Sequence, residues 1–388
     1  MKTFSKKYFL KRFKIGVVKL RGHRFEPRNI CYNPLKNEGK SMYVITGGGT
    51  GGHLAIAKAL AIALKDKKQS MIYIGSMQGQ DRAWFEQSDL FEAVYFLDTT
   101  GVVNARGVSL ARAMWRQLKG IFSLRAIFAK HEIKGVISVG GFSAGPASMA
   151  AVLFGRRLFI HEQNAIKGRL NQILSPFARV IFGSFEDGGK NFIKTPYPVR
   201  KEFFLESRVR REIKTILFLG GSQGAVAINN FALSLAQDLI LRGYKIIHQC
   251  GVKDLERMKQ EYIQMGIFGK IDLFDFSPDI FGRISQADCC VCRAGASSVW
   301  ELAASGIPCL YVPYPYAAGD HQYHNALYFE KKKLGLIAQQ KDLTPEKLWE
   351  FFEFIGPNMA GISQGLQNTI QKNGAEMIVG RIMDSLQA

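Results

Sequence analysis

Five glycines, a threonine and a histidine stand together in the run GGGTGGH at positions 47–53. The run satisfies the G-x-G-x-x-G pattern of dinucleotide sites, which alone is a weak signal. A nicotinamide dinucleotide site would place a ribose-binding acid about 20 positions on, at the end of the next strand. The strand expected at Met71 to Ile74 is followed by no acid before Asp81, which disfavours that interpretation. The loop instead suits close approach of a bulky anion beside Thr50 and His53, with a structural turn or a capping histidine as the alternative.

A second polar cluster, His161-Glu162-Gln163-Asn164, follows the apolar run Leu158 to Ile160. The carboxyl end of a parallel strand is where doubly wound folds bind ligands. The position therefore favours a functional site at 161–164.

Two further glycine turns follow expected strands in the second half of the chain. GSQGA at 221–225 opens a helix expected at 227–242 and is the best candidate for a diphosphate cradle, because free N–H groups at a helix N-terminus attract anions. The turn 293–298 precedes a helix with Glu301 about two turns in. Glu301 could chelate a ribose diol or pair with Arg293.

Two patterns imitate metal sites. Cys289 and Cys292 form C-x-x-C, but positions i and i+3 of a strand face opposite ways and no second Cys/His pair follows, so core packing is expected. His321 and His324 stand near Asp320, yet the chain lacks the Asp-x-Asp that metal-dependent nucleotide-sugar enzymes need. We expect neither a metal nor a cofactor.

Short apolar strands that alternate with helices in both halves predict parallel sheets covered on both faces. Residues 196–214 are rich in charge and proline without a clear period, as an interdomain linker is. We expect an α/β fold with two Rossmann-like doubly wound domains that face a cleft. Their expected limits are 42–204 and 205–365, with a helix at 366–388 and a basic extension at 1–41 outside the fold.

Composition excludes several classes of protein. With 388 residues, 47% hydrophobic and 22% charged, the chain is neither disordered nor a disulfide miniature. Its most apolar stretch, Phe142 to Phe154, is much shorter than the roughly 20 residues that cross a bilayer. Six cysteines in a chain this long do not suggest a disulfide framework, so we expect a reducing, cytoplasmic setting.

Half of the net charge of +20 lies in residues 1–41. That segment ends at Met42, immediately before an expected strand. We expect Met42 to be the natural start and residues 1–41 to be an upstream translation or a tail; a nucleic-acid-binding arm is the alternative.

The interval Thr99 to His131 carries no acid, but basic residues and Trp115 flank a set of apolar residues at helical spacing. This pattern is typical of an interfacial helix on an anionic membrane. It equally describes an amphipathic helix packed on a core.

Taken together, these segments resemble the MurG family of transferases, which add N-acetylglucosamine from UDP-N-acetylglucosamine to lipid I, a polyprenyl-diphosphate muramyl-pentapeptide, and so form lipid II. Seven ordered motifs carry the resemblance: GGGTGGH (47–53), SVGGFSAGPASMAA (138–151), HEQNA (161–165), YPVR (197–200), LGGSQGA (219–225), ADCCVCRAGASSVWELAASGIPCLYVPYP (287–315) and DHQYHNA (320–326). The family usually has Asn where this chain has Tyr197.

The resemblance implies a GT-B fold and inversion at the anomeric carbon without a metal. It implies an acceptor-binding and membrane-binding first domain and a UDP-sugar-binding second domain. The enzyme would serve peptidoglycan synthesis as a peripheral protein on the cytoplasmic face of the plasma (inner) membrane, with an anionic membrane surface as partner and no nucleic acid.

The resemblance also implies residue roles, position by position. On the acceptor side it places Gly140, Gly141 and Ser143, with Thr50, Gly51 and Gly52 between the acceptor diphosphate and the donor sugar. On the donor side it places Asn164, Arg200, Ser222, Gln223, Gly224, Ser277, Ala296, Ser297, Ser298, Val299, Trp300, Glu301 and Gln322.

In such a reaction the acceptor's C4 hydroxyl attacks the anomeric carbon, and charge grows on the departing UDP. Helix N-termini at Gly221–Ala225 and Gly295–Ser297 can stabilise that charge in place of a metal. We expect His53 to be the general base and Glu162 to be the second candidate, because both stand at strand ends facing the cleft.

The alternative activities are UDP-sugar epimerisation, which needs no acceptor, and transfer by another GT-B enzyme with a lipid acceptor. A nucleic-acid-binding protein would depend on residues 1–41.

Overall fold

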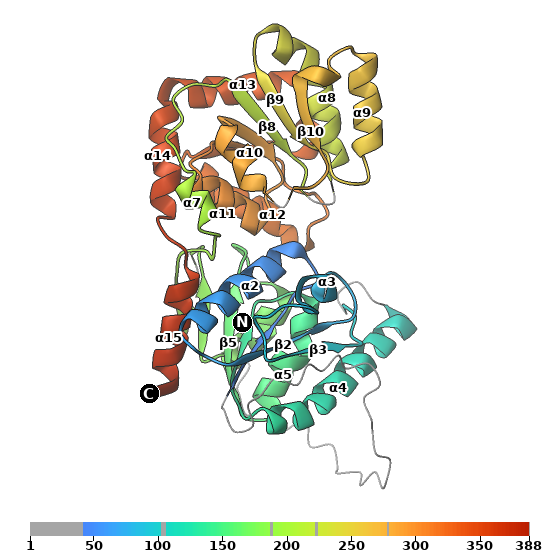
Figure 1. The fold of residues 1–388 in the computed structure, drawn as a ribbon, viewed down its shortest axis with the longest axis vertical. Helices are drawn as coiled ribbons and strands as arrows, with labels where there is room; N and C mark the ends of the chain where they lie inside the picture. The colour runs from blue at the N-terminus through green and yellow to red at the C-terminus, as the bar shows by residue number, and fades with distance from the viewer. Residues whose placement is uncertain (1–41, 102–105, 187–188, 222–223, 278, 388) are drawn as a thin grey trace.

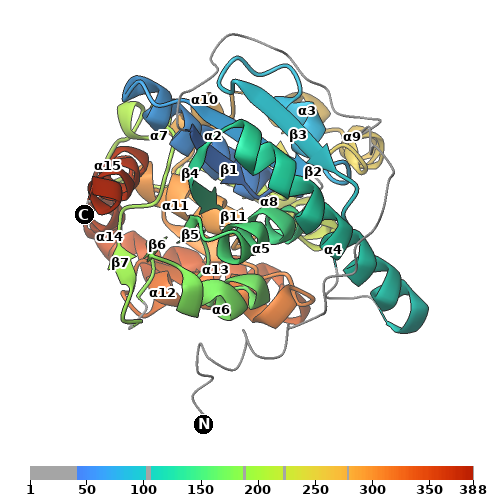
Figure 2. The ribbon, with the colours of Figure 1, turned by 90° about the horizontal axis from the view of Figure 1, so that it is seen from below.

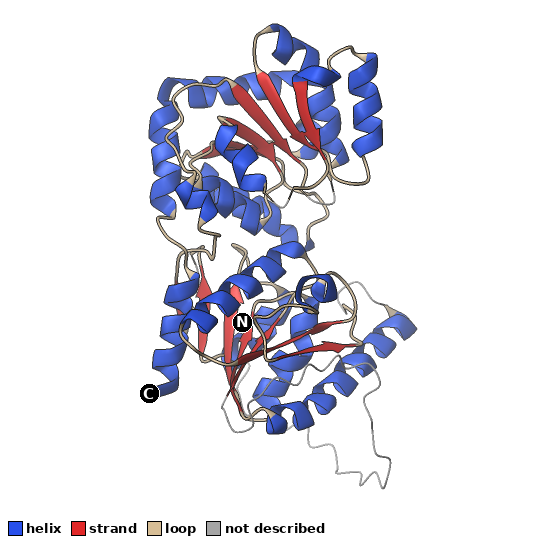
Figure 3. Cartoon of the chain, viewed as in Figure 1, coloured by secondary structure: helices blue, strands red, loops and turns tan. Residues whose placement is uncertain are grey.

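The computed structural model describes residues 42–101, 106–186, 189–221, 224–277 and 279–387 (Figure 1). The basic segment 1–41 lies outside these ranges, so the expectation about it stays a prediction. Within the described ranges the chain forms two α/β domains of similar design, each with helices on both faces of a parallel sheet (Figure 3).

The first sheet has seven parallel strands in the order β3-β2-β1-β4-β5-β6-β7. The strands are β1 Met42–Thr46, β2 Met71–Ser76, β3 Ala93–Leu97, β4 Ile133–Ser138, β5 Arg157–Glu162, β6 Val180–Gly183 and β7 Phe192–Lys194. The order reverses between β1 and β4, so the loops that follow these two strands leave the sheet side by side. That point is where open α/β sheets bind ligands.

The helices of this half are α2 Gly51–Asp66, α3 Asp81–Phe85, α4 Gly107–Lys130, α5 Gly145–Leu153 and α6 Arg169–Leu174. Alternate residues of β1 point to opposite faces of the sheet. Tyr43 and Ile45 join the core beneath α2, whereas Val44 joins the core beneath α4 and α5. Burial of both faces explains why these strands are apolar without alternation.

The second sheet has six parallel strands in the order β10-β9-β8-β11-β12-β13, with the reversal between β8 and β11. The strands are β8 Thr215–Leu219, β9 Lys245–Gln249, β10 Ile271–Phe274, β11 Cys289–Cys292, β12 Cys309–Tyr311 and β13 Gly335–Ile337. The helices are α7 Glu202–Leu205, α8 Val226–Leu241, α9 Leu255–Gln264, α10 Ile280–Gln286, α11 Ala296–Ala304, α12 His321–Glu330, α13 Pro345–Ile355 and α14 Met359–Thr369. The second reversal brings the carboxyl ends of β8 and β11 side by side.

The segment 196–214 is more firmly held than a flexible linker. It contains α7, which contacts α10 and α11, and the completely buried Arg210. The Arg210 guanidinium donates hydrogen bonds to backbone carbonyls, among them Ala287 at 3.2 Å and Ile284 at 3.3 Å. These bonds fasten the start of the second half to the loop before β11.

The C-terminal stretch expected as one helix is two. Helix α14 ends at Thr369, and α15, Ala375–Gln387, turns back along the first half, where it packs on α2 (Figures 1 and 2). At the turn, Gly374 N–H donates to Tyr197 O at 3.2 Å, and a Cβ on Gly374 would lie 1.7 Å from Pro196 O. Only glycine fits at position 374, because the chain passes between the domains here and again at Pro196 and Tyr197, and the two segments touch.

Helix α4 has one buried face and one exposed face, and it lies across the outer side of the first half (Figure 2). Ile121, Leu124 and Phe128 pack in the core, whereas Trp115 is 67% exposed and Phe122 is 68% exposed. None of the helices described is both long enough and apolar enough to span a bilayer.

Candidate active site

The glycine loop after β1 is held by a buried acid. Asp81 Oδ2 accepts a hydrogen bond from Gly49 N–H at 2.6 Å, while Oδ1 accepts from Tyr73 Oη at 3.0 Å and from Ser76 N–H at 3.1 Å. Asp81 is completely buried. Asp81, which lies too far along the chain to be the ribose-binding acid, therefore holds the glycine loop in place. An acid shortly after the neighbouring strand was the available sequence signal for this role.

The two loops at the first reversal touch through their backbones. Gly48 N–H donates to Gly140 O at 3.2 Å, and a Cβ on Gly141 would lie 2.1 Å from Gly48 O. Gly140 and Gly141 both have positive φ, 86° and 79°. These glycines permit a close loop contact, which by itself accounts for their type. Ser143 follows them and is buried.

His53 lies in the first turn of α2, between the glycine loop and the HEQNA loop, defined as residues 161–165. Its Nδ1 is 2.9 Å from Thr50 Oγ1, and its Nε2 is 2.7 Å from Gln163 Nε2. An amide nitrogen only donates, so His53 Nε2 accepts and Nδ1 carries the proton. Burial, aided by the charge of His321, lowers the pKa of His53 to about 4. The ring is therefore neutral near pH 7.

Glu162 ends β5, and its buried carboxylate binds the loop that follows. Oε1 accepts from Asn164 N–H at 3.0 Å, and Oε2 accepts from Gly168 N–H at 3.0 Å and Asn171 Nδ2 at 2.7 Å. Burial raises the pKa of Glu162, and these hydrogen bonds oppose the rise. The geometry assigns the carboxylate to holding the 164–168 turn.

The two halves meet where α2 and α11 begin. A Cβ on Gly52 would lie 3.3 Å from Ser297 Oγ, and Ser297 Oγ is hydrogen-bonded to Tyr197 Oη at 3.0 Å. Tyr197 also stacks on Trp300, with ring centroids 6.1 Å apart and an interplanar angle of 18°. The Tyr197 that replaces the family's usual Asn is thus part of the contact between domains.

Apart from Ser297, the expected donor residues at the start of α11 mostly point into the core. Ala296, Val299 and Trp300 are buried in the core. Of these three residues, only Ala296 belongs to the first helical turn whose N–H groups lack a partner inside the helix, because Val299 N–H already donates to Gly295 O at 3.0 Å. Ser298 is partly exposed and lies in the same turn.

The Arg293 guanidinium has other hydrogen-bond partners than the Glu301 carboxylate. The Arg293 guanidinium donates to Val312 O at 3.1 Å, Pro313 O at 3.2 Å and Gln340 Oε1 at 2.7 Å. Burial raises the pKa of Glu301 to about 7, although the charge of Arg200 favours the carboxylate. The sequence suggested two possible roles for Glu301, ribose binding and an ion pair with Arg293. The structure does not contain the ion pair.

Other expected donor residues take different places around the second sheet. Gln322, at the start of α12, accepts at Oε1 from Tyr314 N–H at 2.9 Å, and Ser277 Oγ accepts from Arg283 at 3.2 Å. Gly224 has a φ of 76°, and a Cβ there would lie 2.4 Å from Cys250 O. Ser222 and Gln223 lie outside the described residues. The exposed Arg200 lies over the Phe203 ring at 5.0 Å.

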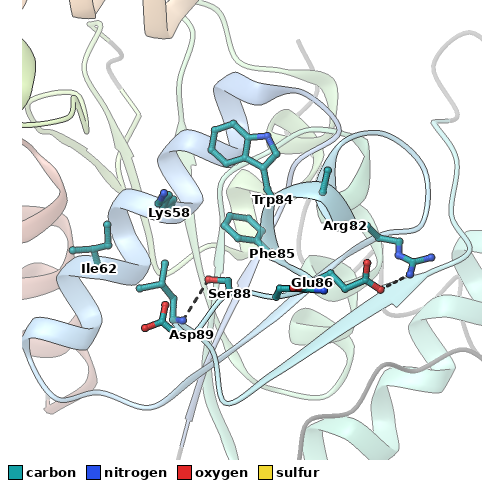
Figure 4. A pocket seen from close by; sticks show the side chains of 11 residues that line it. Lys58, Ile62, Arg82, Trp84, Phe85, Glu86, Ser88 and Asp89 are labelled. Atoms are coloured by element: carbon teal, nitrogen blue, oxygen red, sulfur yellow. Dashed lines mark hydrogen bonds and ion pairs between the residues drawn. The ribbon is translucent and has the colours of Figure 1, made fainter. Parts of the chain in front are cut away.

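A groove of about 590 Å³ on the first half lies between α2 and α3 (Figure 4). Lys58, Ile62 and Trp84 line it, together with the ion pair between Arg82 and Glu86. None of the site residues expected from the sequence lines the groove.

Known protein families match both halves of the chain. The glycosyltransferase family 28 N-terminal domain matches residues 43–182, and the family 28 C-terminal domain matches residues 215–355. A Helicobacter hepaticus protein named UDP-N-acetylglucosamine–N-acetylmuramyl-(pentapeptide) pyrophosphoryl-undecaprenol N-acetylglucosamine transferase is 54% identical over 88% of this chain and 98% of its own length. The chain belongs to the MurG family. A Campylobacter fetus protein of the same name is 48% identical over 88% of this chain and 99% of its own length.

One solved structure supports the same MurG assignment, and a second supports the fold. The crystal structure of Acinetobacter baumannii MurG is 28% identical, covers 89% of this chain and all of its own, and has a TM-score of 0.73. The glycosyltransferase SnogD from Streptomyces nogalater shares the fold, with a TM-score of 0.63 at 12% identity. The two parallel sheets are thus the GT-B arrangement.

Sequence reasoning did not predict the contacts that three residues make around the site. Asp81, Gln163 and Asn325 hold the glycine loop, His53 and the HEQNA loop, respectively. Gln163 and Asn325 stood inside recognised motifs, but no local pattern indicates which partner a buried amide meets.

Proposed function

We propose that this chain transfers N-acetylglucosamine from UDP-N-acetylglucosamine to the C4 hydroxyl of the muramyl sugar of lipid I, forming lipid II for peptidoglycan synthesis. The observation that carries the proposal is the meeting of two helix N-termini, at Gly52 and Ser297, beside the HEQNA loop. Each N-terminus attracts a phosphate group. Two diphosphates, one on the acceptor and one on the donor, are what this transfer brings together.

The donor diphosphate would bind the N-terminus of α11 and the turn before α8. Both helices follow strands at the reversal of the second sheet, so both begin at the same edge of that sheet. Charge that develops on the departing UDP would be stabilised there by fixed dipoles without a metal, an effect typically worth several kcal/mol. Glu301 would bind the ribose, and Gln322 and Asn164 the transferring sugar.

His53 would act as the general base. Its ring is neutral, and Nε2 is the lone-pair nitrogen, so exchange of Gln163 for the acceptor hydroxyl would place a base on the attacking oxygen. Glu162 remains the second candidate, but three hydrogen bonds already occupy its carboxylate. We propose that Glu162 positions the loop that carries Asn164.

The exposed face of α4 would dock on the cytoplasmic leaflet of the plasma membrane. Val108, Met114, Trp115, Leu118 and Phe122 are at least 40% exposed there. The exposed Arg112 and Arg125 lie on the same helix. Apolar side chains with flanking basic residues suit an anionic lipid surface. One face of the helix packs in the core, and the other face would be the one that contacts lipid.

The decisive experiment is to incubate the protein with labelled UDP-N-acetylglucosamine and a lipid I analogue. Labelled lipid II and stoichiometric UDP are expected, and omission of the acceptor should abolish UDP release. UDP-sugar conversion without any acceptor would instead identify an epimerase. Transfer to a different lipid acceptor with no product from lipid I would identify another GT-B enzyme.

A further inference from the structure

Three cysteine side chains meet inside the second domain. Cys290 and Cys292 are two residues apart on β11 and so face the same side of the sheet, and Cys309 on β12 is paired with Cys290 in the parallel register. Their Sγ atoms all lie within 4.8 Å of one another, and all three residues are completely buried. Within the described ranges, no other group of three Cys, His, Asp or Glu residues is close enough to share an ion.

The cluster differs from the pair that the C-x-x-C spacing suggested. Cys289 is equally buried but lies on the opposite face of β11. Burial raises the pKa of Cys290 and Cys292, whereas hydrogen bonds from these two thiols lower the pKa of Cys309 against the effect of its own burial. The three sulfurs therefore form one buried group that excludes Cys289.

We propose that Cys290, Cys292 and Cys309 form a buried site for a thiophilic, three-coordinate metalloid, with trivalent arsenic as the ligand class. Arsenous acid and three thiols give one arsenic trithiolate and three waters. Three As–O bonds break, three As–S bonds form, and each thiol proton leaves with a hydroxide, so no group is oxidised or reduced. A trivalent ion with three thiolates carries no net charge.

Neutrality decides between arsenic and zinc at this site. A net charge in a fully buried site is costly unless it is paired. Zinc in structural sites takes four ligands, and with three thiolates it would leave a negative charge in the core. Three sulfurs in the interior of a sheet therefore match trigonal arsenic better than tetrahedral zinc.

The two strands that carry the three cysteines lead into segments that contain proposed donor residues. Strand β11 continues into the 293–298 turn, and β12 into the segment that leads to Gln322. Because the sulfurs are inaccessible in the closed domain, uptake requires a transient opening of the sheet and is expected to be slow.

The test uses the full chain with Cys31→Ser, so that every remaining thiol has a described position. Sodium arsenite is added to the native protein, and native mass spectrometry counts bound arsenic. One arsenic per chain is expected, and Cys289→Ala, the matched control on the opposite face of the same strand, should bind equally. Cys309→Ala should bind roughly a hundredfold more weakly, because one intramolecular ligation step is lost.

X-ray absorption on the arsenite-treated protein provides a readout that needs no core variant. Three sulfur neighbours per arsenic are expected. No bound arsenic, two sulfurs with an oxygen, or equal affinity in folded Cys309→Ala would overturn the proposal. Stoichiometric binding of zinc chloride in preference to arsenite would also overturn it.

Discussion

Asn325 Nδ2 donates a hydrogen bond to Asn164 Oδ1 at 3.1 Å, which joins α12 of the second domain to the HEQNA loop of the first. The same buried amide accepts from Ala165 N–H at 2.8 Å and donates to Ala294 O at 3.1 Å. One side chain therefore holds loops from both sheets in register. Since the donor and acceptor bind different domains, this register would set the distance between the reacting sugars.

Asn325→Ala should lower both stability and turnover. It leaves buried polar partners unpaired at Asn164, Ala165 and Ala294, at a cost of about 1–3 kcal/mol for each group that water does not reach. Urea unfolding should show the loss, and kcat should fall because the HEQNA loop is no longer held. Asn368→Ala, an exposed change on α14, is the control. Wild-type kcat and stability in Asn325→Ala would contradict this role.

His53→Ala should lower kcat by about a hundredfold or more, as loss of a general base does. The donor KM should change little, because His53 would contact the acceptor. Burial lowers the pKa of His53 to about 4, so the base stays unprotonated as the pH falls below 6.5. The acidic limb of the kcat/KM profile should therefore lie well below pH 6.5.

His324→Ala, on α12, is the matched histidine control and should retain activity. Glu162→Gln separates the two candidate bases. If that variant folds normally and loses as much kcat as we expect for His53→Ala, while His53→Ala stays active, the assignment of the base must be reversed.

Glu301→Gln should stabilise the ligand-free protein at high pH and weaken donor binding. Burial raises the pKa of Glu301 from 4.5 to about 7, so the folded state holds this proton more tightly than the unfolded state. The associated stability is complete below about pH 4.5 and is lost as the pH rises through 7. A shift of this size corresponds to roughly 3 kcal/mol.

Melting temperatures at pH 5 and pH 8 check this prediction. The difference between the variant and wild type should appear at pH 8 and nearly vanish at pH 5. The donor KM should rise, since loss of charged hydrogen bonds to a ribose costs about 1.5–3 kcal/mol. Glu256→Gln on the surface of α9 is the control. An unchanged donor KM would remove Glu301 from the proposed site.

Replacing Trp115 and Phe122 with Ser should weaken binding to anionic liposomes without loss of fold, because both side chains are exposed. Ile121 is left intact, since it is buried and its loss would damage the core. Replacing Arg112 and Arg125 with Gln should weaken binding by about 1 kcal/mol per charge at low salt, and by less at high salt.

Leu241→Ser, an exposed apolar change in the second domain, serves as the liposome control. Donor affinity in solution should be unaffected in every α4 variant. Undiminished sedimentation of the Ser pair and the Gln pair with anionic liposomes would mean that another surface docks on lipid.

The periodicity of the sequence was sufficient to predict two parallel sheets, because a strand buried on both faces is uniformly apolar and a glycine turn marks its end. The same local signals placed Glu162 at the end of a strand, where the structure has it, whereas His53 lies in the first turn of α2 and α11 already begins at Ala296, inside the expected 293–298 turn. The family motifs extended this to a function, since each motif is a short contiguous run. All of this information is local in the chain.

Tertiary structure decided which of these ends meet. Asn164 and Asn325 are 161 residues apart, and Tyr197 and Ser297 are 100 apart, so no local pattern encodes either contact. Tertiary packing also determines that Gln163 is the partner of His53 Nε2 and that Trp300 is buried in the core. Propensity and periodicity act within a few residues, whereas the pairing of a buried polar group depends on whichever distant atoms the folded chain brings within hydrogen-bond range.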